Sequence, residues 1–246
     1  MAKLAIIGGT GLTTLKNLEI LNREVVHTPY GEPSGPLTHG ELCGQQVVFL
    51  ARHGYGHTIP PHKVNYRANI WALQQAGASE VIAVNAVGGI TPGMHPGRLV
   101  FPDQIIDYTW SRVNTYFEEG LNYVTHIDFT EPYCESLRER LIAGAMAIGL
   151  DAAECGTYGA TQGPRLETTA EINRLERDGC HIVGMTGMPE AALARELELC
   201  YASVAVVANM AAGRGAGRIT MEDIEQHLKT GMESVRTLLE HVLPNV

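Results

Sequence analysis

Short apolar segments that end in glycine or in a polar residue recur along this chain and alternate with helical segments. The clearest are "LAIIGG" at 4–9, "QQVVFLARHG" at 45–54, "EVIAVNAVGGI" at 80–90 and "YASVAVVANMAAG" at 201–213. These runs are continuously apolar, as strands are when helices cover both faces of a sheet. The pattern predicts an α/β fold with a central mixed, largely parallel sheet flanked by helices.

The other expected elements follow from the same two periodicities. Apolar runs also predict strands within 24–33, 98–109, 154–165 and 181–187. Apolar residues at helical spacing, with turn residues at the ends, predict helices at 65–77, 133–149, 170–179, 188–198 and 221–243. No linker, repeat or low-complexity segment interrupts the series, so we expect one domain over residues 1–246.

The charge of the chain argues against some classes of function. Its 18 basic and 27 acidic side chains give a formal net charge of −9, and no Lys/Arg-rich run offers the basic surface that nucleic acids require. "MAKLAIIGGTGL" lacks the apolar core of a signal peptide, and no apolar run reaches the roughly 20 residues of a membrane span. We therefore expect no nucleic-acid partner, no membrane partner and a cytoplasmic location.

The cysteines are odd in number and widely spaced. They lie at Cys43, Cys134, Cys155, Cys180 and Cys200, without a CxxC pair. This spacing indicates neither a zinc site nor a disulfide framework. We expect each cysteine to be a small buried side chain in a reducing compartment.

Polar or glycine-rich residues follow five of the expected strands. They are Gly8 to Gly11, Arg52 with His53, Asn85 to Gly89, Met185 with Thr186, and Asn209. Ligands of open α/β sheets bind at the carboxyl ends of the strands. These five positions are therefore expected to converge on one pocket.

Several of these residues suit an anion. In "GGTGL", backbone N–H groups and Thr10 could contact an oxyanion, with a simple tight turn as the alternative. Arg52 ends an apolar strand, where a buried guanidinium needs a partner that an anionic ligand could supply. Thr186 precedes a helix and could cap it or bind an anion. His57 and His62 lack the spacing of metal ligands, so we expect no metal site.

The stretch "TQGPRLETTAEI" at 161–172 places Glu167 just before an expected helix. Thr168 or Thr169 could cap that helix, and Glu171 lies near its first turn, where a negative charge is favourable. Glu167 could thus be solvated charge at a helix start, or it could contact a ligand. The stretch by itself leaves both interpretations open.

Motifs of several other enzyme classes are missing from the sequence. No serine or cysteine nucleophile sits in a GxSxG setting, and neither a dinucleotide-binding GxGxxG fingerprint nor a P-loop is present. What is left is a set of phosphate-type donors with one carboxylate and one amide. This set indicates transfer chemistry with inorganic phosphate as a reactant.

Six motifs, in this order, carry a resemblance that runs nearly end to end: "IIGGTGL", "ARHGYGHTIPPHKVNYRANIWAL", "NAVGGI", "GPRLETTAE", "GMTGMPEAALARE" and "YASVAVVANMAAG". They are similar to those of the trimeric purine nucleoside phosphorylase and methylthioadenosine phosphorylase superfamily. The resemblance implies that family's fold and reversible phosphorolysis of a purine nucleoside to a free base and a ribose 1-phosphate. It also implies a homotrimer and no cofactor, since phosphate is a co-substrate.

The resemblance assigns residues to the phosphate and the sugar. Phosphate would be held by Thr10, Arg52, His53, the backbone at Ala86, and Thr186. Met185 would pack under the ribose. His126, in "YVTHIDFTEPY", matches a position that reaches into the site of a neighbouring subunit.

The resemblance also assigns the base end of the site. Asn209 would accept N7–H and donate to O6 of the leaving purine, and Glu167, next to Leu166, would accept N1–H. The adenosine branch of the family carries aspartates where this chain has Asn209 and Ala211, and a serine in place of Glu167. Adenine has no N1–H, so a buried mismatch would disfavour it. We expect a 6-oxopurine base, hypoxanthine or guanine.

The sugar end resembles the methylthio branch. Met221 and Ile224 fall where that branch has apolar residues, whereas enzymes for ordinary nucleosides place a histidine against the 5′-hydroxyl. The nearest histidine, His227, lies too far along the helix. Met221 and Ile224 could alternatively be core positions of an amphipathic helix. We expect the glycine-rich loop at 212–218 to be mobile and to close over the base.

Together the two ends predict reversible phosphorolysis of 5′-methylthioinosine to hypoxanthine and 5-methylthioribose 1-phosphate, a step of purine salvage. The first alternative is a purine nucleoside phosphorylase for inosine and guanosine. Two others are a methylthioadenosine phosphorylase and a non-catalytic nucleoside-binding sensor on the same fold.

Overall fold

One mixed sheet runs through the computed structural model, which describes residues 4–12, 17–217 and 219–245. In these residues its eleven strands are β1 (Leu4–Gly8), β2 (Glu19–Glu24), β3 (Leu37–Leu42), β4 (Gln45–Ala51), β5 (Glu80–Gly89), β6 (Leu99–Val100), β7 (Gln104–Asp107), β8 (Ala152–Ala153), β9 (Thr157–Ala160), β10 (Ile182–Gly184) and β11 (Cys200–Met210). Their main order is β2-β3-β4-β1-β5-β10-β9-β7, and β11, β6 and β8 extend the sheet from β5. The predicted α/β fold is confirmed.

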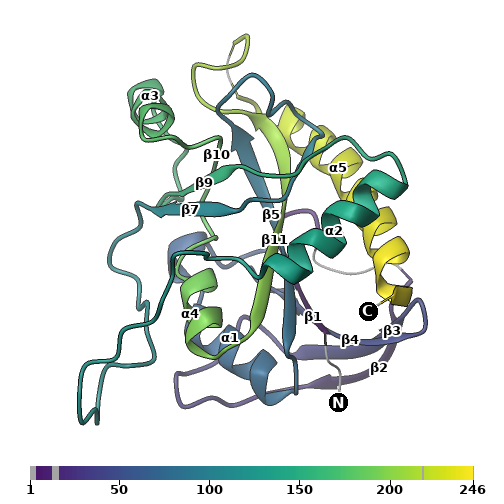
Figure 1. The fold of residues 1–246 in the computed structure, drawn as a ribbon, viewed down its shortest axis with the longest axis vertical. Coiled ribbons are helices and arrows are strands. Elements are labelled where there is room, and N and C mark those ends of the chain that lie inside the picture. The colour runs from purple at the N-terminus through teal and green to yellow at the C-terminus, as the bar shows by residue number, and fades with distance from the viewer. Residues whose placement is uncertain (1–3, 13–16, 218, 246) are drawn as a thin grey trace.

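Helices cover both faces of this sheet (Figure 1). They are α1 (Tyr66–Gln75), α2 (Glu135–Ala147), α3 (Thr169–Arg177), α4 (Glu190–Glu196) and α5 (Met221–Val242), with short 3-10 turns at Pro61–Lys63 and Leu243–Asn245. On one face α1 packs against α4, and on the other α2 packs against α5. Two large buried apolar clusters, one on each face, and a smaller third cluster that includes residues of α3 form the core. No described helix is long and apolar enough to cross a bilayer.

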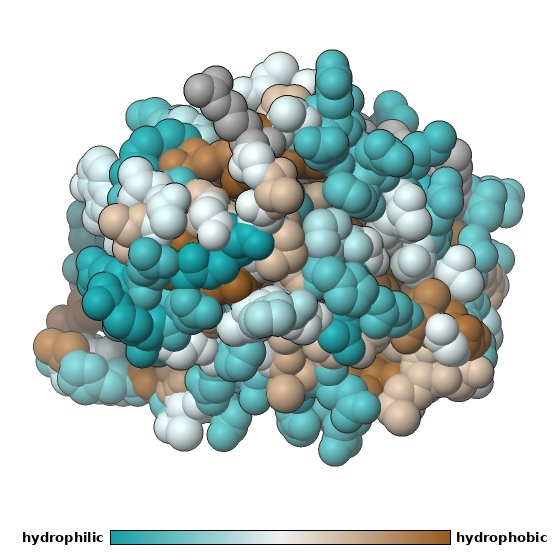
Figure 2. Space-filling view, turned by 90° about the horizontal axis from the view of Figure 1, so that it is seen from above, coloured by the Kyte–Doolittle hydropathy of each residue, from teal (hydrophilic) through white to brown (hydrophobic). Residues whose placement is uncertain are grey.

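The outer surface differs from this core in character. Seen from above, the molecule shows a mostly hydrophilic face in which hydrophobic residues form small, separated areas (Figure 2).

The helices α3 and α5 have polar outer sides and begin at side-chain caps, Thr168 and Thr220 respectively. Such caps satisfy backbone N–H groups that no helical partner reaches.

The predicted helices are confirmed with small shifts at their ends. Helix α1 ends just before Gly77, whose φ of 91° is the left-handed conformation expected at a C-terminal glycine. Helix α3 begins at Thr168, which forms a capping box with Glu171. Helix α4 begins directly after Pro189.

The predicted strand at 24–33 is wrong. Strand β2 ends at Glu24, and only an isolated bridge between Thr28 and Gly31 follows. Two prolines, Pro29 and Pro33, lie within the stretch and cannot donate ladder hydrogen bonds. The sheet instead gains β3, which pairs with β4 through a two-residue turn at Cys43 and Gly44, both with positive φ.

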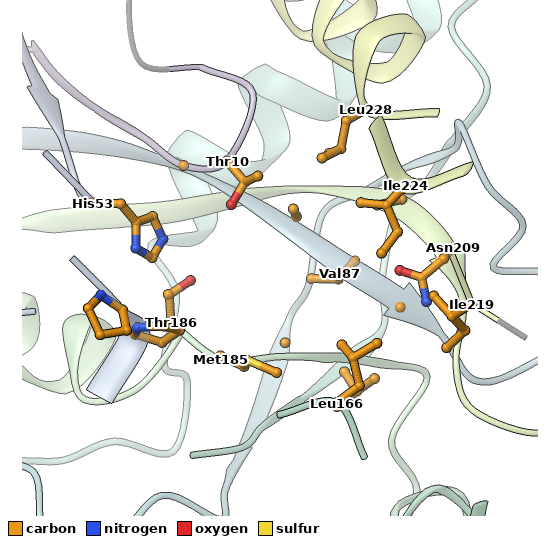
Figure 3. A pocket seen from close by; sticks show the side chains of 18 of the residues that line it. Thr10, His53, Val87, Leu166, Met185, Thr186, Asn209, Ile219, Ile224 and Leu228 are labelled. Atoms are coloured by element: carbon orange, nitrogen blue, oxygen red, sulfur yellow. The ribbon is translucent and has the colours of Figure 1, made fainter. Parts of the chain in front are cut away.

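The long strands bring the predicted site residues to one place. Strand β5 pairs in parallel with β1 along one edge and with β11 along the other, so their carboxyl ends lie together. The end of β10 joins them because Val183 pairs with Gly88. Figure 3 shows side chains from these strand ends facing a common cavity.

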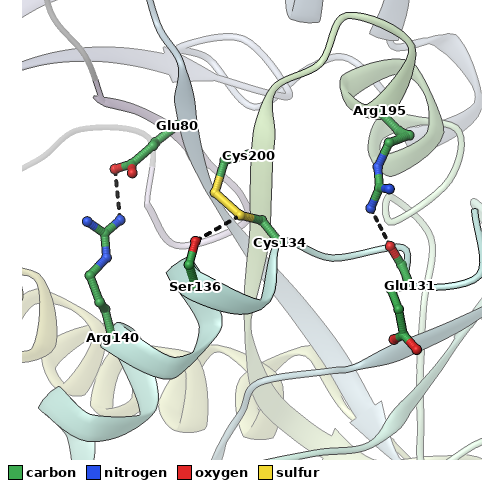
Figure 4. The surroundings of a disulfide bond; sticks show 7 residues. All are labelled: Glu80, Glu131, Cys134, Ser136, Arg140, Arg195 and Cys200. Carbon is green, nitrogen blue, oxygen red and sulfur yellow. Dashed lines mark hydrogen bonds and ion pairs between the residues drawn. A yellow bond between two sulfur atoms is a disulfide. The ribbon is translucent and has the colours of Figure 1, made fainter.

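The expectation for the cysteines is wrong in two respects. First, Cys134 and Cys200 form a disulfide (Figure 4). Second, two of the three free thiols, Cys43 and Cys155, are exposed, and only Cys180 is buried. The pair is 66 residues apart in the sequence, so no spacing pattern reveals it. The fold brings the two together because Cys134 N donates to Tyr201 O beside the start of β11.

The contact between α5 and β11 yields a stability prediction. A Cβ added at Gly231 would collide with Val206 Cγ1. Alanine gains about 1 kcal/mol of helix propensity over glycine, but overpacking a buried contact costs about 1–3 kcal/mol. We expect Gly231→Ala to lower the free energy of unfolding by up to about 2 kcal/mol in urea denaturation. Thr230→Ala, at the exposed neighbouring position, is the control; a more stable Gly231→Ala variant would contradict this packing.

Candidate functional site

A cavity of about 330 Å³ lies at the carboxyl ends of β1, β4, β5, β10 and β11. Its size is within the range of small-molecule sites. Ten of the twelve residues predicted for the site line it: Thr10, Arg52, His53, Ala86, Leu166, Glu167, Met185, Thr186, Asn209 and Ile224. The exceptions are His126 and Met221. Residues from opposite ends of the chain are thus brought to one place.

The cavity has a polar end and a mixed end. Thr10, His53 and Thr186 lie together at one side, while Asn209 and Leu166 lie at the other (Figure 3). The loop after β1 reaches the polar end because of Gly9, where an added Cβ would collide with Val84 O. Only glycine permits this close approach of two backbones.

Arg52 has its partner inside the chain. Its guanidinium is fully buried, and Nε and Nη2 donate to the Glu190 carboxylate at 2.6 and 2.7 Å. Nη1 donates to Val84 O at 2.8 Å. Burial alone would lower the pKa of Arg52, but the charge and hydrogen bonds of Glu190 outweigh it and raise the pKa. Glu190 is therefore the partner that the buried Arg52 needs, and an anionic ligand is not required to balance its charge.

Arg52 can still contribute to anion binding. A guanidinium carries five N–H groups, and three are used by Glu190 and Val84 O. One N–H on each terminal nitrogen is left, and Arg52 lines the cavity.

His53 is neutral in this environment. Burial, and then the charge of Arg52, lower its pKa to about 4. Its Nδ1 lies 2.8 Å from Ile59 O, and a carbonyl oxygen only accepts, so Nδ1 carries the proton. In the neutral ring Nε2 then has a lone pair. His53 is thus an acceptor at Nε2 near neutral pH.

Thr186 is held by a buried polar chain. Asn85 Nδ2 donates to Thr186 Oγ1 at 2.8 Å, and Ser203 Oγ donates to Asn85 Oδ1 at 2.8 Å. Asn85 and Ser203 are at most 2% exposed. Because Thr186 Oγ1 already accepts a hydrogen bond, its own O–H is free to donate into the cavity.

Glu167 is not part of the helix cap. The capping box of α3 uses Thr168 and Glu171, and Arg165 pairs with Glu171 at 2.7 Å. Glu167 instead accepts a hydrogen bond from Thr161 Oγ1 at 2.6 Å through Oε1 and faces the cavity. A separate pair of residues starts the helix, so Glu167 is not needed for the cap, and its contact with a ligand stays a prediction.

A β-bulge determines the position of Asn209. Val207 pairs with Val87, but Asn209 rather than Ala208 pairs with Gly88. Bulges of this kind redirect a side chain next to a site. Gly88 has no side chain to fill the space that faces Asn209. The Asn209 amide donates to Met210 O at 2.8 Å, and its Oδ1 accepts no hydrogen bond from a described residue.

The wall formed by α5 and the preceding residues is apolar. Ile219, Ile224 and Leu228 line the cavity there. Met221 does not, since its side chain is 65% exposed. His227 is also outside, with Nδ1 3.1 Å from Ala208 O. Of the predicted loop at 212–218, Arg218 lies outside the described residues.

His126 lies on a long irregular segment. Residues 108–134, between β7 and α2, contain no helix or strand, and His126 is exposed. Figure 1 shows part of this segment projecting away from the sheet. The segment also carries exposed Trp110, Tyr123 and Val124. The insertion of His126 into a neighbouring subunit stays a prediction.

Sequence reasoning missed most of the residues that support the site. Glu190, Asn85, Ser203 and Thr161 hold Arg52, Thr186 and Glu167 in place. Asn85 is expected near the pocket as a polar strand-end residue, and Glu190 had a usable signal because a buried arginine needs a partner. The others are ordinary polar residues within apolar strands or a loop.

The chain matches the Phosphorylase superfamily over residues 3–244. It is 58% identical over 243 residues to a probable S-methyl-5′-thioinosine phosphorylase of Pseudomonas syringae, which covers 99% of each chain. It is 46% identical to the 6-oxopurine nucleoside phosphorylase of Pyrococcus furiosus, over 99% of this chain and 93% of the other. A methylthioadenosine phosphorylase from Schistosoma mansoni in complex with adenine superposes with a TM-score of 0.94 at 32% identity, over 100% and 92% of the two chains.

The depressed pKa of His53 predicts a pH dependence of stability. The folded-state pKa is about 4 against an ordinary 6.5, so between these values the unfolded chain binds more protons than the folded one. The free energy of unfolding therefore falls as the pH drops through this window and is unaffected above it. Between pH 7 and pH 5 the wild type loses free energy of unfolding. We expect this loss to be smaller by about 1–2 kcal/mol in His53→Gln, whose side chain can still donate to Ile59 O. Equal pH dependence of the two proteins in urea denaturation would contradict the buried neutral histidine.

Proposed function

The chain belongs to the phosphorylase superfamily, and we propose that it catalyses the reversible phosphorolysis of 5′-methylthioinosine to hypoxanthine and 5-methylthioribose 1-phosphate. One observation carries the proposal. A single cavity contains oxyanion donors at one end, Glu167 with Asn209 at the other, and an apolar wall from α5.

The phosphate would bind at the polar end. Thr10, Thr186 and the remaining N–H groups of Arg52 can donate to its oxygens, as can the backbone at Ala86. Neutral His53 presents a lone pair at Nε2, so it would accept the single O–H of a hydrogen phosphate dianion. The other groups are hydrogen-bond donors, and the unprotonated oxygens of the phosphate can accept from each of them.

The reaction requires one bond to form and one to break. A phosphate oxygen supplies the electron pair for the new bond to C1′, and the C1′–N9 electron pair leaves with the purine. The purine takes up a proton from water, and the new phosphate ester releases to water the proton that hydrogen phosphate carried, so the protons balance. Positive charge builds on the ribose, which packs on Met185, and the adjacent phosphate stabilises it. Because phosphate is itself the nucleophile, we propose that no metal or organic cofactor takes part.

The leaving base would be bound by the two groups at the other end. Asn209 Oδ1 would accept N7–H as charge moves into the purine, and its amide would donate to O6. Glu167, held by Thr161 through one oxygen, would accept N1–H with the other, and Leu166 would pack on the ring. Adenine offers a lone pair at N1, which a carboxylate opposes, so the pair favours a 6-oxopurine.

The sugar end distinguishes this proposal from an inosine and guanosine phosphorylase. The α5 wall offers Ile219, Ile224 and Leu228 but no histidine for a 5′-hydroxyl. An apolar wall suits a methylthio group better. The bacterial relative at 58% identity, named a probable methylthioinosine phosphorylase, supports the same choice.

We further propose that the active enzyme is a homotrimer in the cytoplasm. His126 of each chain would complete the sugar end of a neighbour's site, where Met221 would also contribute if the start of α5 turns inward. The apolar side chains exposed near Trp110 and Tyr123 support a contact with a second copy. The Cys134–Cys200 disulfide is the observation that argues against a reducing location.

Asn209→Ala tests the chemical step. Since Asn209 acts on the leaving base, we expect kcat for 5′-methylthioinosine to fall by about 100-fold, with little change in KM for phosphate. The measurement is hypoxanthine release with phosphate varied, and Asn173→Ala on the exposed face of α3 is the control. Near-native turnover in Asn209→Ala would remove this residue from the mechanism. Nucleoside binding by the wild type without phosphate-dependent release would instead indicate a sensor.

Ile224→Thr tests the sugar end. The substitution keeps a β-branched side chain but places a hydroxyl in the apolar wall. We expect the preference for 5′-methylthioinosine over inosine, measured as a ratio of kcat/KM values, to fall by about tenfold. Met221→Thr is the matched variant outside the cavity. A preference unchanged in Ile224→Thr would contradict the proposed methylthio pocket, and one lowered in Met221→Thr would show that Met221 reaches it.

A further inference from the structure

Arg112 joins two loops that each carry one polar residue of the site. It lies in the irregular segment 108–134 and does not line the cavity. The base loop, residues 161–168, follows β9 and carries Glu167. The phosphate loop, residues 185–189, follows β10 and carries Thr186.

All five N–H groups of Arg112 have acceptors in these loops. Nη1 donates to Met185 O at 2.8 Å and to Met188 O at 2.6 Å. Nη2 donates to Thr161 O at 3.2 Å and to Gln162 O at 2.8 Å. Nε donates to Gln162 Oε1 at 3.0 Å. One side chain therefore fixes four backbone carbonyls, two in each loop.

These carbonyls belong to the residues that determine the site geometry. Thr161 holds Glu167 through its hydroxyl at 2.6 Å, and Met185 directly precedes Thr186. The strands before the loops are joined where Thr161 N donates to Gly184 O at 2.8 Å. Beyond that point the Met185 side chain packs against Gly163, and Arg112 hydrogen-bonds to both loops.

The charge of Arg112 is not used in an ion pair with any described carboxylate. Its guanidinium instead lies over the Tyr66 ring, with 5.6 Å from Cζ to the centroid. A planar fork with five fixed donors can hold several carbonyls at set positions, whereas an ammonium has only three donors. The arrangement is that of a cross-link between loops.

We propose that Arg112 is a positioning residue that sets the separation of Glu167 and Thr186, and so of base and phosphate in the reacting complex. The inference rests on the proposed phosphorolysis. It adds that the Arg112 side chain connects the segment 108–134, which carries His126, to the loops at both ends of the site. Misplacement of reacting groups by about 1 Å can cost about 100-fold in rate.

Arg67 provides a matched control. It also holds the segment 108–134, donating to Thr115 O at 3.2 Å and to Glu118 at 2.6 Å. It has no hydrogen bond to either loop among the described residues. Arg67→Met therefore loosens the same segment without releasing the loops.

The test compares Arg112→Met, Arg112→Lys and Arg67→Met with the wild type. Steady-state rates are measured with phosphate and with 5′-methylthioinosine varied separately, and again with 5′-methylthioadenosine. For Arg112→Met we expect kcat/KM to fall about 100-fold, both KM values to rise, and the preference for the hypoxanthine nucleoside to narrow. Arg112→Lys should be intermediate, and Arg67→Met should keep the wild-type preference.

A merely structural role for Arg112 would lower the folded fraction and leave both KM values and the base preference unchanged. That result in Arg112→Met would overturn the inference. If Arg112→Met does not fold, the test rests on Arg112→Lys. KM values and a base preference in Arg112→Lys equal to those of the wild type would also overturn the inference. If the wild type releases no base in a phosphate-dependent reaction, the proposed function and this inference both fail. If the wild type is active and Arg112→Met has the same KM values and base preference, only the inference fails.

Discussion

The buried ion pair between Arg52 and Glu190 is the interaction on which the rest of the site depends. Both side chains have no exposed area, and the pair joins the end of β4 to the start of α4. Tyr201 of β11 donates to the same carboxylate at 2.9 Å, and Val84 O of β5 accepts from Arg52. A buried charge whose partner is removed is strongly destabilising. The pair therefore holds four elements in the one arrangement in which their ends surround the cavity.

The Arg52–Glu190 pair also leaves the proposed phosphate site without excess positive charge. The formal net charge of the chain is −9, and Glu190 cancels the charge of Arg52. Under the proposed function, affinity for phosphate would therefore come from directed hydrogen bonds. The Asn85–Thr186 contact orients a donor, and the fixed tautomer of His53 orients an acceptor. Hydrogen bonds from such fixed groups are stronger at a site of low dielectric than in water.

The fold and most of the cavity could be predicted from the sequence because both depend on local signals. Apolar runs mark buried strands, and polar residues directly after them mark strand ends that must meet. What could not be predicted depends on contacts between distant segments. Arg112 reaches loops about 50 and 75 residues away in the chain, and neither partner carries a pattern that reveals it. The same holds for Cys134 and Cys200, and for the bulge that places Asn209 opposite Gly88.

The measurement that tests the proposed function most directly is a competition in one mixture. The wild-type enzyme, with phosphate, would receive equal concentrations of 5′-methylthioinosine, inosine and 5′-methylthioadenosine, and the initial rate of consumption of each would give the ratios of kcat/KM. We expect 5′-methylthioinosine to be consumed fastest, as the roles proposed for Glu167 and Asn209 at the base and for the α5 wall at the sugar require. Faster consumption of inosine would contradict the methylthio pocket, and faster consumption of 5′-methylthioadenosine would contradict the role given to Glu167.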